Sequence, residues 1–381
     1  MASLYIHIPF CVKRCIYCDF YSDTRMEYVD AFMDALLHEM EIRRDGWQDE
    51  PFDTIYFGGG TPSRLTPQEL KKILDAVYRC FPVASHPEIT LEANPDDLTG
   101  DYVTSLATLP VNRISMGVQS FNDRELRLLN RRHTAQEAID AVERCKETGL
   151  TNISIDLIFG LPEQSGETWS YTINKAIALD VPHLSAYNLT YEDGTVIYKM
   201  IKNKKVNPVE DDVCAQFYTL LTEKLAGAGF IHYEISNFAR CSDIYPYGRI
   251  SIHNSSYWNG THYLGLGPSA HSYDGTSRSW NVASLTSYIK GCCNKSPVRE
   301  TEKISNRSAY NDFVITRLRT MWGVSLNELR EKFGKACENY FLEKSERFIS
   351  INKLKKQGDY VKVLPDYFFI SDSILRELIE L

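Results

Sequence analysis

The sequence predicts an α/β fold, an incomplete (β/α)6 TIM-like barrel followed by a small C-terminal α+β region. Short strand-like runs alternate with longer amphipathic runs, the pattern of repeated strand–helix units around a parallel sheet. Six such units can be identified, fewer than the eight of a closed barrel. With 381 residues, the chain has room for one large domain and a smaller one.

The predicted elements follow each other regularly along the chain. The first strand covers residues 4–8, where apolar residues occupy every second position, and the helix after it, at about 26–44, has apolar residues at helical spacing. Further strands are predicted at 54–57, 89–92, 113–118, 153–159 and 184–189, with helices at 66–80, 99–108, 134–148, 165–179 and 209–228. Thr66 and Pro67 are typical of an N-cap and a first-turn proline.

A change of composition near residues 292–297 predicts a boundary before the C-terminal region. We expect three parts, at 1–230, 231–295 and 296–381. In the last part, helices are predicted at 313–321, from Ser325 with a capping box to Glu328, at 336–348 and at 372–380, and a hairpin at 360–363 and 367–370. Helices beside a two-stranded wing predict a winged-helix-like module.

Bulk properties exclude several classes of function. The net charge of −8 argues against a general nucleic-acid binder. Nothing before Cys11 resembles a secretory signal, and no run of about 18 apolar residues is present, so we expect a cytoplasmic protein. Its ten cysteines are then expected to be thiols and metal ligands, not disulfides.

Three cysteines, Cys11, Cys15 and Cys18, follow the first strand in a C-x3-C-x2-C spacing. Thiolates are the ligands that zinc and iron–sulfur clusters prefer. A structural zinc site closes with four ligands and would need His7 as the fourth. A four-iron cluster on three cysteines leaves one iron open to a small molecule, and we favour this alternative over zinc and over thiols clustered by chance.

These residues resemble the radical S-adenosylmethionine (SAM) family, in the branch that contains HemN and HemW. The resemblance extends over roughly residues 1–290 and includes five further motifs: Gly58-Gly59-Gly60-Thr61-Pro62, Glu92-Ala93-Asn94-Pro95, Gly117-Val118-Gln119-Ser120-Phe121, Asn130-Arg131 and Asp156-Leu157-Ile158-Phe159-Gly160-Leu161-Pro162. In a barrel, side chains at the carboxyl ends of the strands surround one mouth. We therefore expect these motifs to meet there, although a rim of internal salt bridges is an alternative for the charged residues.

The resemblance implies a role for each matching residue. It assigns a 4Fe-4S cluster to Cys11, Cys15 and Cys18. It assigns SAM to Tyr5, Tyr17, Gly59, Gly60, Thr61, Glu92, Gln119, Arg131 and Asp156. The cluster would reduce SAM, with the protein supplying position and dryness. No catalytic residue is assigned, and whether the protein is an enzyme stays open.

Within the branch, the sequence is most similar to the haem-chaperone members. The coproporphyrinogen enzymes have a further cysteine two residues after the third and an N-terminal stretch before the loop, whereas this chain has Phe20 at that position and ten residues before Cys11. The chain also has the chaperones' H-N-x-x-Y-W motif, at 253–258. Imidazole ligates haem iron and aromatic faces suit a porphyrin, so His253, Tyr257 and Trp258 are the expected haem contacts. A structural or SAM-mouth role for His253, or ligation by His262 or His271, are the alternatives.

The resemblance implies a haem chaperone that delivers haem to respiratory haem proteins, using its cluster and SAM. The alternative is an oxygen-independent coproporphyrinogen III dehydrogenase or another radical SAM oxidoreductase of porphyrin metabolism, and a zinc protein without redox chemistry is a third. The expected partners are haem and its acceptor proteins, and not nucleic acid. Peripheral membrane association and homodimer formation stay open.

Overall fold

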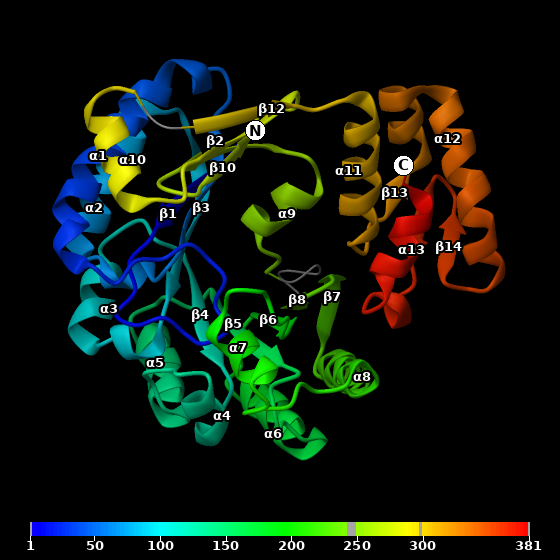
Figure 1. Ribbon diagram of the computed structural model, residues 1–381, viewed down its shortest axis with the longest axis horizontal. Coiled ribbons are helices and arrows are strands. Elements are labelled where there is room, and N and C mark those ends of the chain that lie inside the picture. The colour runs from blue at the N-terminus through cyan, green and yellow to red at the C-terminus, as the bar shows by residue number, and fades with distance from the viewer. Residues whose placement is uncertain (1, 242–248, 297–298, 380–381) are drawn as a thin grey trace.

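The computed structural model describes residues 2–241, 249–296 and 299–379 (Figure 1). Its largest element is a twelve-stranded sheet in the order β12-β11-β10-β9-β1-β2-β3-β4-β5-β6-β8-β7. The six central strands run parallel: β1 (Ala2–Ile8), β2 (Phe52–Gly59), β3 (Val83–Ala93), β4 (Arg113–Gln119), β5 (Ile153–Phe159) and β6 (His183–Asn188). The predicted fold class, an incomplete barrel of six parallel strands with helices outside, is confirmed.

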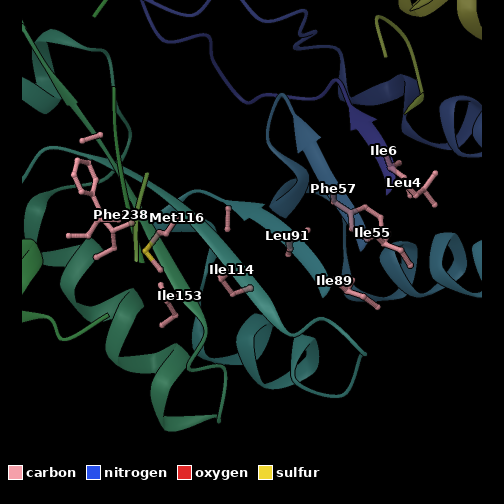
Figure 2. Packing of buried hydrophobic residues seen from close by; sticks show 14 of the residues in the cluster. Leu4, Ile6, Ile55, Phe57, Ile89, Leu91, Ile114, Met116, Ile153 and Phe238 are labelled. Carbon is pink, nitrogen blue, oxygen red and sulfur yellow. The ribbon is translucent and has the colours of Figure 1, made fainter. Parts of the chain in front are cut away.

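The two faces of this sheet differ in chemistry, because successive side chains of a strand point to opposite faces. Apolar side chains such as Leu4, Ile55, Leu91, Ile114 and Ile153 form the buried core on one face (Figure 2). The helices that pack there are α1 (Val29–Arg43), α2 (Pro67–Cys80), α3 (Gly100–Leu106), α5 (Ala135–Glu147) and α6 (Gly166–Ala178). Each fully buried aliphatic side chain contributes about 1.5–3 kcal/mol.

The inner face of the same strands is polar. Its side chains are those of the alternate positions, namely Ser3, Tyr5, His7, Thr54, Tyr56, Glu88, Thr90, Glu92, Arg113, Ser115, Ser154, Asp156, His183, Ser185 and Tyr187. His7, Glu92 and Tyr187 lie near the carboxyl ends of their strands. Because polar groups are costly to enclose without partners, such a face is suited to hydrogen-bonding a ligand.

The helix start predicted at Thr66 is confirmed. The Thr66 hydroxyl accepts a hydrogen bond from the Glu69 amide, and the Glu69 carboxylate accepts one from the Thr66 amide, which makes a capping box, while Pro67 occupies the first turn. Both bonds satisfy amides that the helix itself leaves without partners. The helix that follows β2 is therefore fixed at its start by local sequence.

Strands that the sequence did not predict extend the sheet at both ends. Beyond β6 lie β8 (Asn237–Arg240) and β7 (Phe230–Glu234), and beyond β1 lie β9 (His262–Leu266), β10 (His271–Tyr273), β11 (Ser277–Asn281) and β12 (Arg299–Lys303). β9 runs parallel to β1, and each of the other added strands is antiparallel to the neighbour it extends. Helices α4 (Asp123–Leu128), α7 (Val196–Lys202), α8 (Asp211–Gly227) and α10 (Leu285–Cys293) complete the main body. The short helix α9 (Ile252–Trp258) lies on the polar side of the sheet, facing away from α1 and α2 (Figure 1).

The C-terminal region contains α11 (Asn306–Leu318), α12 (Leu326–Ser350), α13 (Ser371–Leu378) and a three-stranded sheet in the order β13-β15-β14. Its strands are β13 (Val324–Ser325), β14 (Leu354–Gln357) and β15 (Tyr360–Val363). The helices and wing of the prediction are present, with α12 broken at Gly334, which has a φ of 85°. No helix in the described ranges has the length and apolar content needed to cross a membrane.

The prediction of the hairpin is wrong for its second strand, at residues 367–370. β15 pairs with the preceding β14 through a two-residue connection in which Gly358 has a φ of 59°. Residues 367–370 form no strand, because Pro365 begins a 3-10 turn over Pro365–Tyr367 directly after β15. Glycine readily adopts a positive φ, so the tighter turn is at Gly358 and not at the proline.

Candidate functional site

The cysteine loop leaves the carboxyl end of β1 and lies beside two other motifs. The buried Cys11 has its Sγ 3.4 Å from the Thr61 hydroxyl, and the Arg131 guanidinium donates to the Cys15 Sγ at 3.4 Å. All three cysteines of the loop are free thiols. Burial raises the pKa of the Cys18 thiol to about 11, so a metal centre that binds here must displace protons.

A closed zinc site would require His7 to break its present hydrogen bonds. The His7 ring has both nitrogens engaged, Nδ1 with the Tyr5 hydroxyl at 3.2 Å and Nε2 with the Tyr21 carbonyl at 2.9 Å. His7 is thus unavailable as a fourth ligand in this structure. Within the described ranges, no group of three or more His, Cys, Asp or Glu side chains is arranged to hold a single metal ion.

The glycine-rich loop after β2 lies close against the strand and loop of the cysteines. A Cβ on Gly59, whose φ is 111°, would lie 2.6 Å from the His7 ring, and one on Gly60 would lie 2.8 Å from the backbone of Pro9. Both positions therefore require glycine. The Gly60 amide donates to the Ile8 carbonyl at 2.8 Å, and this holds Thr61 beside Cys11.

The carboxyl group of Glu92 lies on the polar face, near the carboxyl end of β3. It accepts hydrogen bonds from the Tyr56 hydroxyl at 2.8 Å and from the Gly59 amide at 3.2 Å. The surrounding protein displaces water and raises the pKa of Glu92 to about 7. Around neutral pH this carboxyl group is therefore divided between its neutral and charged forms.

Asp156 is the second carboxyl group of this face. It accepts from the Ser115 hydroxyl at 3.0 Å, and burial raises its pKa. It was expected at or just beyond a strand end, but it lies in the middle of β5, level with Gly117 of β4 and Ser185 of β6. Both Glu92 and Asp156 remain half-buried, so each retains contact with solvent on the inner side.

Arg131 ties the segment after β4 to the cysteine loop. Besides Cys15, its guanidinium donates to the Gly117 carbonyl and to Asn94 Oδ1, the latter at 2.7 Å. The neighbouring Asn130 has a φ of 60° and donates from its amide to the Arg14 carbonyl at 3.0 Å. The Asn-Arg pair therefore fixes the position of the loop.

Gln119, the last residue of β4, has a φ of 68°. Left-handed backbone is uncommon for a residue with a side chain and is found mostly where function requires it. A Cβ on Gly117 would lie 2.9 Å from the Gln119 amide nitrogen and 3.3 Å from the Arg131 guanidinium. Gly117 thus leaves room for both side chains. Tyr17, in the cysteine loop, is half-buried, and burial raises the pKa of its hydroxyl.

The motif on α9 reaches the polar face through His253. This buried ring hydrogen-bonds through Nδ1 to the Thr54 hydroxyl at 2.7 Å and through Nε2 to the Tyr257 hydroxyl at 3.0 Å. Its backbone amide donates to Glu88 at 2.9 Å. Burial lowers the pKa of His253 to about 3, so the ring is neutral, and in this structure neither of its nitrogens is free to bind iron.

The expected SAM and cluster residues are thus brought together, and the expected haem residues are divided. Tyr257 lies beside His253, whereas Trp258 lines a pocket between α9 and the C-terminal region. His262, 3.2 Å from Glu50, and His271, stacked on Trp280, lie on β9 and β10, which extend the sheet beyond β1. Sequence reasoning missed Tyr56 and Ser115, which bond the two carboxyl groups. The available signal was that Tyr56 and Ser115 each lie two residues before a motif glycine, Gly58 or Gly117, and therefore on the same face of their strand.

Comparisons with known proteins bear on this arrangement. The family model of the radical SAM superfamily matches residues 5–176, and that of the HemN C-terminal domain matches residues 304–365. The chain is 37% identical to the heme chaperone HemW of Bacillus subtilis, over 90% of this chain and 89% of that protein. It is 33% identical to the heme chaperone HemW of Lactococcus lactis, over 99% and 97%. The structure of coproporphyrinogen III oxidase (HemN) from Escherichia coli, a radical SAM enzyme, superposes with a TM-score of 0.84 at 23% identity, covering 99% of this chain and 90% of that one.

Proposed function

The chain belongs to the radical SAM family, in the HemN/HemW branch, and we propose that it is a haem chaperone that binds haem and delivers it to haem-dependent respiratory proteins. The observation that carries this proposal is the likeness to heme chaperones over nearly the whole chain, at 37% identity over 90% of its length. The H-N-x-x-Y-W motif supports it. Delivery would take place in the cytoplasm, with attachment to the membrane where respiratory proteins are assembled.

The proposal assigns the cofactors to the residues that lie together at the inner face. Cys11, Cys15 and Cys18 would hold a 4Fe-4S cluster, since all three are free thiols on one loop. When bound, the cluster supplies an electron to SAM. Glu92 and Asp156 would accept hydrogen bonds from the ammonium and hydroxyl groups of SAM, because both are half-buried carboxyl groups on the polar face.

The remaining SAM contacts proposed are Tyr5, Tyr17, Gly59, Gly60, Thr61, Gln119 and Arg131. Arg131 would present its charge to a ligand while bonded to Asn94 and Cys15. The glycines at 59 and 60 would leave backbone groups open to it. These side chains bind and orient, and no proton-transfer role is assigned to them.

For haem, the proposal names the helix α9 with His253, Tyr257 and Trp258. Iron ligation by His253 stays a prediction, and it requires that the bonds to Thr54 and Tyr257 break. Carriage is favoured over decarboxylation because Phe20 stands where the enzymes of this branch have a further cysteine. Phe20 is 70% exposed, so the side chain at this position has no structural role in the core.

An anaerobic haem titration of the cluster-reconstituted protein tests the proposal, followed by the Soret band. We expect one haem per chain. The His253→Ala variant is compared with His38→Ala, which removes a half-buried histidine of α1. Loss of the site in His253→Ala alone, in a protein that keeps its far-UV circular dichroism, supports a haem contact there.

Two results would overturn the proposal. The first is the absence of any stoichiometric haem site in the wild-type protein. The second is consumption of SAM coupled to decarboxylation of coproporphyrinogen III, which would establish the alternative function of an oxygen-independent coproporphyrinogen III dehydrogenase.

A further inference from the structure

A second cavity lies away from the cysteine loop, where α9 meets the C-terminal region. It has a volume of about 580 Å³ and is bordered by Ala2, Ser3 and Thr54, at the amino ends of β1 and β2. The cysteines follow the opposite end of β1. Volumes of roughly 300–1,000 Å³ are usual for small-molecule sites, so this cavity has the size of a ligand pocket distinct from the cluster and SAM site.

Three large aromatic side chains line the pocket. Trp258 comes from α9, and Trp322 and Tyr360 come from the C-terminal region. Trp322 is 39% exposed and Tyr360 is 44% exposed. Ile252, 54% exposed, adds an aliphatic side chain on α9. Exposed apolar side chains gathered around a cavity mark a place where an apolar partner binds, and flat aromatic faces favour a flat one.

The pocket also contains polar groups without partners. The indole Nε1 of Trp258 and the hydroxyl of Ser255 are buried and have no hydrogen-bond partner in the described chain. Buried polar groups are nearly always hydrogen-bonded. Arg317, another lining residue, donates to the Trp258 carbonyl and to Glu328, both at 2.8 Å. A ligand with an apolar body and hydrogen-bond acceptors would satisfy both kinds of surface.

We propose that this pocket binds a planar tetrapyrrole that bears carboxylate side chains, with Trp258, Trp322 and Tyr360 against the ring and the Trp258 indole N–H and Arg317 beside a carboxylate. The inference rests on the proposed function of haem carriage. It places the tetrapyrrole ring of the cargo beside Trp258, at the junction of α9 and the C-terminal region, and makes ligation of its iron by His253 the competing assignment.

The composition of the pocket predicts how the ligand is held. No histidine, cysteine or methionine is among the described residues that line it, and these side chains are the commonest haem-iron ligands. Binding should therefore depend on the ring and its carboxylates more than on iron. A carrier that does not coordinate iron through a strong ligand would release its cargo readily to a protein that does.

The test is an anaerobic titration of the full-length, cluster-reconstituted protein with three ligands: haem, iron-free protoporphyrin IX and haem dimethyl ester. Tyr360→Ala removes one aromatic face, and Ile252→Glu places a charge that repels a carboxylate. Tyr78→Ala and Ile351→Glu are matched controls, because these side chains are 47% and 50% exposed and do not line the pocket. Unfolding curves confirm that all four variants fold.

We expect Tyr360→Ala and Ile252→Glu to weaken haem binding about tenfold, which corresponds to about 1.4 kcal/mol, and the controls to stay within about twofold. Protoporphyrin should bind within about threefold of haem, and the dimethyl ester about tenfold more weakly, since it has lost its carboxylates. Equal affinity of the pocket variants and their controls, in a wild type that binds haem, overturns the pocket assignment and leaves haem carriage standing.

Failure of protoporphyrin to bind, with haem bound tightly, also overturns the assignment, because the site then depends on iron and points to His253. If the wild type binds neither haem nor protoporphyrin at a stoichiometric site, the proposed function and the pocket assignment are both wrong. The three outcomes are distinguishable in one set of titrations.

Discussion

The imidazole of His253 stacks on the ring of Tyr56, with 4.7 Å between the ring centroids and 24° between the planes. Tyr56 in turn donates its hydroxyl to Glu92. The helix α9 therefore contacts the Glu92 carboxyl group of the proposed SAM site indirectly, through the His253 and Tyr56 side chains. The same helix lines the second pocket through Trp258, so one seven-residue element touches both proposed ligand sites.

Tyr56→Phe isolates the hydrogen bond to Glu92, because it keeps the ring against His253 and removes only the hydroxyl. That bond favours the carboxylate and lowers the pKa of Glu92. Without it the pKa rises above about 7, and less of the group is charged at neutral pH. If Glu92 binds the ammonium group of SAM, calorimetric titrations should show the pH midpoint of SAM binding moved upward.

Tyr102→Phe provides the control for this experiment. Its hydroxyl donates to the Leu65 carbonyl at 3.1 Å, away from the polar face, so its loss should leave the pH profile of SAM binding unchanged. An identical profile in Tyr56→Phe and the wild type would contradict the coupling between Tyr56 and the SAM site.

Local and periodic signals were enough to predict the central strands and the outer helices. Apolar residues at alternate positions placed β1, and Thr66 with Pro67 placed the start of α2. The strands that extend the sheet beyond β1 and β6 were missed because they lack that signal. β12, with the sequence Arg-Glu-Thr-Glu-Lys, is exposed throughout; charged residues are typical of an edge strand, where they prevent pairing with other chains.

The motifs predicted which residues lie near one another better than they predicted the hydrogen bonds among them. Cys11, Glu92 and Arg131 were identified from the motifs of the family, and each contacts a residue of another motif. Tyr56 was missed because its role depends on the reach of its hydroxyl to Glu92 on the adjacent strand β3, and the pattern of a single strand does not contain such a contact. Trp258 and His253 lie five residues apart on α9, and helical geometry directs their side chains to different sides of the helix.

Glu234 provides a pH-dependent test of the fold. This buried residue ends β7 and accepts from the Ser236 amide at 3.2 Å, and burial raises its pKa from 4.5 to about 7. As pH rises, Glu234 loses its proton in the unfolded chain before it does so in the folded protein. The contribution of this group to stability therefore falls between about pH 4.5 and pH 7 and is constant above. The penalty at high pH is up to about 3 kcal/mol.

Glu234→Gln should remove this penalty. Urea unfolding is expected to show the variant gaining stability over the wild type from about pH 5 to pH 7, with a constant gain at pH 8. Glu41→Gln, an exposed position on α1, should show no such trend. A stability difference independent of pH would show that Glu234 is ionised in the folded protein at all these pH values.

Substitution of the cysteines tests the cluster assignment. Cys11→Ser, Cys15→Ser and Cys18→Ser should each abolish or strongly reduce iron content after anaerobic reconstitution, since hydroxyl oxygen is a poor ligand for such clusters. Cys293→Ser is the control, because Cys293 is an exposed free thiol at the end of α10. Retention of full iron content by any one of the three loop variants would contradict its role as a cluster ligand.

Arg113 is the buried group whose role the proposed cofactors leave unexplained. It begins β4 on the polar face, is 1% exposed, and has Nε and Nη1 without hydrogen-bond partners in the described chain. The buried Nε and Nη1 groups without acceptors are costly, but the positive charge of Arg113 favours the charged forms of Glu92 and Asp156 and lowers their pKa. Arg113→Met keeps the volume and removes both effects, so it should change the free energy of unfolding by less than about 1 kcal/mol in the ligand-free protein. The contrasting variant Arg131→Met removes a guanidinium with three partners and should lower it by about 3 kcal/mol. Urea unfolding at neutral pH measures both, and a loss of stability in Arg113→Met as large as in Arg131→Met would show that water or another group completes the bonds of Arg113.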